Sequence, residues 1–97
     1  SYNKEEVRTI VIHIPKGYEI KNLNDLNMDY NYEKNREKIY NFTSSYEVKD
    51  SVLYIHLTEY YKDINCPKEN YDAFRKVVDA SADFNKITLL LKPISTR

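Results

Sequence analysis

The strongest constraint in this sequence is a two-residue alternation that runs through the centre of the chain. Between residues 38 and 48, aromatic and polar side chains alternate, and residues 52–61 repeat the period with aliphatic side chains. A short polar segment, Lys49–Ser51, separates the two stretches. A period of two places successive side chains on opposite faces of a strand, so we predict a long antiparallel hairpin. The side chains predicted to face inward are Tyr40, Phe42, Tyr46, Leu53, Ile55 and Leu57.

Other segments also have strand character. Residues 7–15 alternate, with three isoleucines on one face, and residues 18–23 and 26–32 alternate over shorter lengths. The consecutive leucines of residues 86–93 predict a final strand that is buried on both faces. The chain holds ten tyrosines, which favour strands, and a single glycine. Because tight primed turns prefer glycine, we expect hairpins closed by longer polar loops, with residues 33–37 as one of them.

Residues 67–82 have helical spacing. Pro67 suits the first helical position, and Glu69 places a negative charge in the first turn. Asp72 and Lys76 form an i,i+4 pair that we place on the exposed side. The apolar stripe predicted to pack against a sheet edge or across an open end consists of Tyr71, Phe74, Val78 and Ala82.

These elements predict a mainly β fold. We expect an antiparallel β-sandwich of about six strands, with one helix before the last strand. A length of 97 residues suits one domain, residues 1–97, with a single core. Fifteen basic and fifteen acidic residues cancel, which removes the positive surface expected of a nucleic-acid-binding protein. No apolar run reaches the length of a membrane span, and residues 1–10 lack the regions of a signal peptide.

Cys66, the only cysteine, precedes the predicted helix, where a thiol can become nucleophilic. A cysteine nucleophile also needs a histidine within hydrogen-bond reach and oxyanion donors, and Pro67 removes the next backbone N–H. His13 and His56 fall in two predicted strands, and with Cys66 they would supply the ligand types of a zinc site if those strands were neighbours. Nothing in their spacing demands such a site. We therefore predict no catalytic residue, no metal site and no cofactor.

The tyrosines suggest a different role. Exposed tyrosine clusters bind protein or carbohydrate surfaces, although large rings also fill the core of a small sandwich. Tyr54 and Tyr60 lie with His56 on the predicted outer face of the hairpin. We predict that Tyr54, His56 and Tyr60 belong to an interaction surface.

Several sequence marks resemble a known domain type. They are Arg8 before an aliphatic strand, "IPKGYEI" at 14–20, the spacing of Pro67, Tyr71, Phe74 and Arg75, and "ITLLLK" at 87–92. Over roughly residues 7–93, the chain resembles the β-sandwich domain of unknown function at the C-terminus of bacterial transglutaminase-like proteins. In that family the catalytic Cys-His-Asp site belongs to the neighbouring papain-like domain. The resemblance therefore implies no catalytic residue here, and it implies a secreted or periplasmic bacterial parent protein.

From this resemblance we expect a non-enzymatic accessory domain, part of a larger protein. Its partner would be a transglutaminase-like domain in the same chain, which it supports or beside which it presents a protein-interaction surface. The alternative is a stand-alone extracellular module that binds a glycan or a protein ligand.

Overall fold

The structure, a computed structural model, describes residues 4–62 and 65–95. Four strands form one antiparallel sheet in the order β1-β5-β4-β3. Their bounds are β1 (Lys4–His13), β3 (Met28–Lys34), β4 (Glu37–Lys49) and β5 (Val52–Tyr61). Two short strands, β2 (Tyr18–Ile20) and β6 (Leu91–Pro93), pair in a second antiparallel sheet. The helix α1 (Tyr71–Phe84) precedes β6, and the 3₁₀ turns η1 (Leu23–Leu26) and η2 (Lys68–Asn70) precede β3 and α1.

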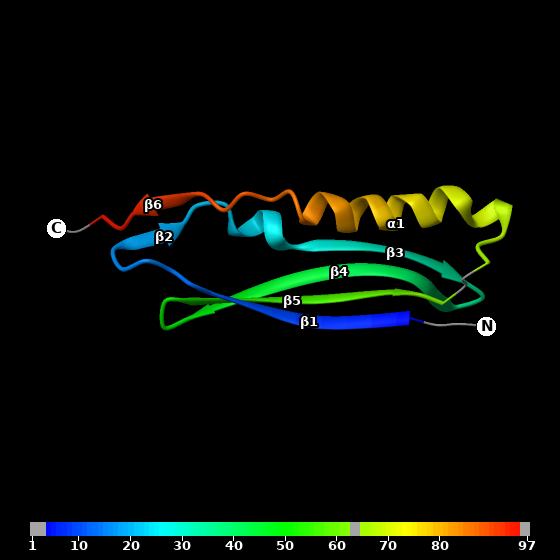
Figure 1. Cartoon of the computed structure of the whole chain (residues 1–97), viewed down its shortest axis with the longest axis horizontal. Helices are drawn as coiled ribbons and strands as arrows, with labels where there is room; N and C mark the ends of the chain where they lie inside the picture. Colours follow the sequence, from blue (N-terminus) through cyan, green and yellow to red (C-terminus); the bar gives the residue numbers. More distant parts are fainter. Residues whose placement is uncertain (1–3, 63–64, 96–97) are drawn as a thin grey trace.

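The described residues form an elongated body of 58 × 20 × 20 Å. Figure 1 shows that α1 and the β2–β6 pair follow one another along the long axis, on the same side of the molecule. The predicted fold is confirmed in its main features: the described residues are mainly β and antiparallel, they form six strands, and the helix precedes the last strand. On the four-stranded sheet, α1 packs against β3 and β4 and η1 packs against β4, and Ile20 of β2 joins the same hydrophobic core.

The long hairpin is confirmed. β4 and β5 pair without interruption from Tyr40 opposite Tyr61 to Lys49 opposite Val52. Five of the six predicted inward side chains are fully buried, and Tyr46 packs against them half-buried. A β-bulge between β3 and β4 leaves Ile39 without a partner on β3, so Ile39 and Tyr40 are both buried. Strict alternation does not allow for this pair of neighbouring buried residues.

The prediction of long polar hairpin loops was wrong. Only Asn35 and Arg36 lie between β3 and β4, and only Asp50 and Ser51 lie between β4 and β5. All four residues have positive φ, at 54°, 67°, 53° and 64°, as a type I′ turn requires of its two central residues. The twist of the long strands enforces this turn type, and asparagine and aspartate tolerate its first position. Arginine and serine then occupy the second position, where glycine is usual.

The face that α1 buries also differs from the predicted stripe. The buried and half-buried side chains that pack in the core are Phe74, Val77, Ala80 and Phe84. Tyr71 is 51% exposed, Val78 is 38% exposed, and Ala82 also faces solvent. The prediction ended the helix at Ala82 and therefore omitted Phe84, whose ring packs 5.6 Å from that of Phe42. Because Phe84 packs in the core, the buried face of α1 lies about 100° around the helix axis from the predicted stripe, which is the angle between consecutive residues.

The last strand is shorter and more exposed than predicted. β6 covers three residues, and Leu90 and Leu91 are 49% and 47% exposed. The Asn22 side chain holds the segment before β6, because its Nδ2 donates to the Thr88 carbonyl (2.9 Å) and its Oδ1 accepts from the Leu90 N–H (2.8 Å). The Asn22 side chain thus pairs two backbone groups, the Thr88 carbonyl and the Leu90 N–H, that a neighbouring strand would pair in a wider sheet. Near β3, Leu26 ends η1 rather than starting the strand, and it is buried there.

Aromatic rings fill the core at the end of the sheet near the start of α1. The Phe74 ring lies 5.3 Å from both the Tyr40 and the Tyr61 rings, and Tyr32 stacks on Tyr40 at 5.7 Å. The Tyr61 hydroxyl donates a hydrogen bond to the Glu59 carboxylate at 2.7 Å. Burial raises the pKa of the Tyr61 phenol well above its ordinary value, and the bond to Glu59 raises this pKa further.

Candidate functional site

Cys66 and the two histidines lie apart. Cys66 is half-buried and packs against the core, whereas His13 and His56 lie on the sheet face that points away from the core. β1 and β5 are indeed neighbours, but His13 faces Val52 while His56 faces Thr9. Four register positions therefore separate the two histidines, which is about 13 Å along the strands. The hydrogen-bonded Cys-His pair of a nucleophilic site is not formed by these residues.

Cys66 instead marks a strained connection. Its φ is 35°, which is unusual for a residue with a Cβ atom, and it stands one residue before Pro67 and the 3₁₀ turn η2. Neither η2 nor α1 has a side-chain cap hydrogen bond at its N-terminus. The chain turns sharply here to bring α1 back over the sheet.

The predicted interaction residues share one face. Tyr54, His56 and Tyr60 lie at alternate positions of β5, on the outer face of the four-stranded sheet, opposite the face that packs against α1. Their cross-strand neighbours on β1 and β4 are Glu5, Thr9, Val11, Asn41, Ser45 and Glu47. Within the described residues, no secondary-structure element lies over this outer face, as Figure 1 shows. Val7 and Val11 on β1 are 70% and 51% exposed there.

His56 is the polar centre of this outer face. Its Nδ1 lies 3.2 Å from the Thr9 hydroxyl oxygen, and its Nε2 lies 3.6 Å from the Glu47 carboxylate. A hydroxyl, an imidazole and a carboxylate in series have the composition of a hydrolytic triad. His56 and Glu47 are about half or more exposed, and the three side chains line neither of the two hollows at β3 and β2.

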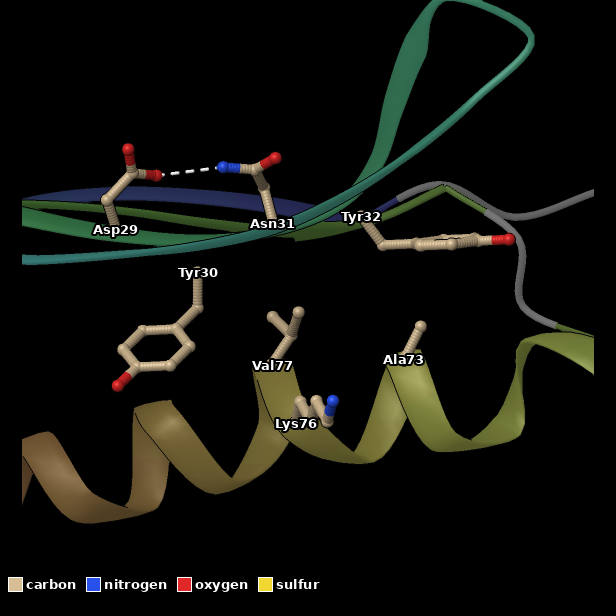
Figure 2. A pocket seen from close by; sticks show the side chains of 7 residues that line it. All are labelled: Asp29, Tyr30, Asn31, Tyr32, Ala73, Lys76 and Val77. Atoms are coloured by element: carbon tan, nitrogen blue, oxygen red, sulfur yellow. Dashed lines mark hydrogen bonds between the residues drawn. The ribbon is translucent and has the colours of Figure 1, made fainter.

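A groove lies between β3 and α1. It has a volume of about 370 Å³ and is lined by Asp29, Tyr30, Asn31, Tyr32, Ala73, Lys76 and Val77. In Figure 2, the Tyr30 and Tyr32 rings lie on the helix side of β3, and Asp29 and Asn31 project from the other side. The Asn31 amide donates to the Asp29 carboxylate at 2.8 Å. Tyr30 is 46% exposed. On the helix side of β3, the exposed Tyr30 ring and Lys76 line this groove together, and an aromatic ring with one charged group is typical of a small-ligand site.

A second hollow, of about 270 Å³, lies at the other end of the molecule. Its lining is more apolar and comes from β2, η1, the end of β4 with the β4–β5 turn, and the segments after β1 and β6: Ile14, Tyr18, Glu19, Ile20, Leu23, Val48, Ser51 and Ile94. Tyr18, Val48 and Ile94 are each more than 40% exposed. Sequence analysis missed both hollows because each joins segments that are far apart in the chain. The run of consecutive leucines, interpreted as a buried strand, lines neither hollow and gave no signal for them.

The chain has no match among known proteins by sequence or by structure: no protein-family profile, no curated protein and no solved structure matches it. Residues 4–62 and 65–95 contain no group of three or more His, Cys, Asp or Glu side chains placed to hold a metal ion. In the same residues, no helix has the length and apolar character needed to cross a membrane.

Proposed function

We propose that this domain is a non-catalytic accessory module that binds another protein surface through the outer face of its four-stranded sheet. The observation that carries the proposal is the composition of this face. An antiparallel sheet whose outer face meets only water usually carries polar side chains there. Among its polar side chains, this face also exposes Val7 and Val11 beside the half-buried Tyr54 and Tyr60, with polar groups around His56 at its centre. Tyrosines and aliphatic side chains with a few polar groups are typical of protein interfaces.

The neighbour that we propose is a papain-like transglutaminase domain in the same polypeptide. The sequence resemblance described above supports this choice, and it also suggests a periplasmic or secreted parent protein of bacterial origin. In this arrangement the catalytic groups belong to the neighbour, and the present domain stabilises it or positions it. Cys66→Ser is then expected to leave the activity of the parent protein unchanged.

The first experiment compares the intact parent protein with a version that lacks residues 1–97. Thermal stability and transamidation are measured for both proteins. We expect a loss of stability or activity on deletion. If neither quantity changes, the accessory role is refuted.

The second experiment locates the surface. Tyr54→Ala together with Tyr60→Ala is expected to reproduce the effect of deleting the domain, without unfolding the domain itself. Tyr71→Ala is the matched control, because Tyr71 is 51% exposed on α1, away from the outer face. Equal effects of the double variant and the control would refute the assignment of this face.

The groove beside α1 supports a second candidate function, a module that binds a glycan. The exposed Tyr30 ring and the Lys76 ammonium group, which both line the groove, offer stacking and hydrogen bonding to a sugar. Titration with a panel of neutral and acidic oligosaccharides, followed by tyrosine fluorescence, tests this function. Binding that Tyr30→Ala abolishes would favour it, and the absence of binding would remove it.

A further inference from the structure

The edge formed by β1 differs from the opposite edge of the sheet. β1 pairs with β5 over ten residues without a register shift, and it contains no proline. At the other edge, the ladder between β3 and β4 is interrupted by the bulge at Ile39, and β3 is flanked by α1. Natural proteins protect long regular edges, because unpaired N–H and C=O groups can pair with another strand. In the part of the chain that the structure describes, no strand pairs with the outer edge of β1.

The register shows which residues of β1 have their backbone groups directed outward. The Ile14 N–H donates to the Ser51 carbonyl at 2.9 Å, in line with the His13–Val52 pair at the end of the ladder. In an antiparallel ladder, residues alternate between pointing their N–H and C=O toward the neighbour and away from it. The even-numbered residues of β1 therefore bond to β5, and the odd-numbered residues point to the open edge. The close approach of the Thr9 and His56 side chains agrees, because side chains lie nearer in a pair without backbone hydrogen bonds.

The odd-numbered residues have a self-complementary order: Glu5, Val7, Thr9, Val11 and His13. We propose that β1 pairs antiparallel with β1 of a second copy of this chain, about a two-fold axis at Thr9. Val7 then faces Val11 of the second copy, and Glu5 faces its His13. Aliphatic pairs, threonine pairs and carboxylate–imidazole pairs each stabilise neighbouring strands. Each outward-pointing residue from Glu5 to His13 gains a hydrogen-bonded partner.

Other registers are less favourable. If the two copies form a continuous sheet with both helices on one face, the even-numbered residues of one β1 must face even-numbered residues of the other. The two-fold axis then passes through one residue of β1 and not between two residues. An axis at Arg8 places two arginines opposite each other, and an axis at Glu6 pairs two glutamates; like charges in these positions are destabilising. An axis at Val7 or Ile10 leaves one end of β1 unpaired. The axis at Thr9 is the centre of the strand from Glu5 to His13.

The remaining parts of the fold leave room for this pairing. α1 packs over β3 and β4, and Figure 1 shows β1 on the side of the molecule opposite α1. Ile10 and Ile12 point to the core side of β1 and are only half-buried, so a second copy would cover them further. The pairing uses the edge of the sheet and not its outer face, so the inference does not depend on the proposed function. It would place the outer faces of the two copies side by side.

The experiment uses the 97-residue chain with Cys66→Ser, which removes the only cysteine. In this background, Thr9→Cys is expected to form an intermolecular disulfide under mild oxidation. Directly opposed residues of a hydrogen-bonded pair have Cα atoms about 5.5 Å apart, within the range of a disulfide. Val7→Cys and Val11→Cys are the matched controls. In this register, the cysteine of either variant lies about 13 Å along the strand from the same cysteine in the second copy, so neither variant is expected to cross-link alone. An equimolar mixture of the two variants is expected to cross-link, because position 7 faces position 11.

Sedimentation equilibrium between about 10 µM and 1 mM measures the association without cysteine chemistry. We expect a reversible dimer that Thr9→Pro weakens about 100-fold, because each copy loses one outward N–H. A proline whose missing N–H faces outward is tolerated in an edge strand, so the monomer should remain folded by circular dichroism. Thr9→Ala keeps the N–H and should keep the dimer. A chain that stays monomeric at 1 mM, or a Val7→Cys variant that cross-links with itself as readily as Thr9→Cys, would overturn the proposal.

Discussion

The turn between β4 and β5 offers a direct test of how strain is distributed in this fold. Ser51 adopts φ 64° at the second central position of a two-residue turn. For a residue with a Cβ atom, the left-handed region costs about 1–2 kcal/mol, and glycine avoids this cost. Glycine loses about 0.5–1 kcal/mol more conformational entropy on folding, which offsets part of the gain. We therefore expect Ser51→Gly to stabilise the domain by about 0.5–1 kcal/mol.

The measurement is urea unfolding followed by circular dichroism, with thermal unfolding as a second probe. For a domain of this size, the expected stabilisation raises Tm by about 4 °C. The backbone bond from Ile14 to the Ser51 carbonyl is kept, because the substitution changes only the side chain. Ser45→Gly is the matched control: the same chemical change at an exposed position within β4 should destabilise by about 0.5–1 kcal/mol. If both variants destabilise equally, the argument from positive φ is refuted.

Three further outcomes are expected. Phe84→Ala should lower the free energy of unfolding, measured in urea, by about 3–5 kcal/mol, and Val78→Ala should lower it by less than about 1 kcal/mol. The reverse order would support the helix stripe predicted from sequence. Because burial raises the pKa of Tyr61, the folded chain keeps this proton after the unfolded chain has lost it, so stability should fall as the pH rises above 10.0, and Tyr61→Phe should lessen this fall above pH 10.0. Asn22→Ala should speed hydrogen exchange at the Leu90 amide by at least about tenfold and leave the exchange rates of the β4–β5 amides unchanged. An unchanged rate at Leu90 would show that the Asn22 side chain does not hold this segment.

Sequence patterns predicted the elements whose packing is local. The β4–β5 hairpin could be predicted because each inward side chain is two residues from the next, and strand pairing follows from the turn between them. The buried face of α1 could not be predicted in this way, because the predicted stripe and the observed buried face, about 100° apart on the helix, both contain Phe74. The choice between them depended on whether Phe84 reaches Phe42, a contact between residues far apart in the chain. The two type I′ turns were missed because tertiary twist, not glycine, determines them.

The candidate surface was partly predictable for a similar reason. Alternation placed Tyr54, His56 and Tyr60 together on the outer face of β5, and the structure has them there. Alternation alone does not give the register between β1 and β5. That register determines that His56 meets Thr9 and not His13, and it therefore determines which polar groups meet on this face.

The extended shape has a mechanical consequence. β1 begins at one end of the 58 Å axis and β6 ends at the other, as Figure 1 shows, so tension between neighbouring domains would pull both strands along their own lengths. In that direction the hydrogen bonds of a strand share the load and do not open one after another. β6 is held by three residue pairs and β1 by ten. Under load, β6 should therefore detach before β1, and the four-stranded sheet should stay intact.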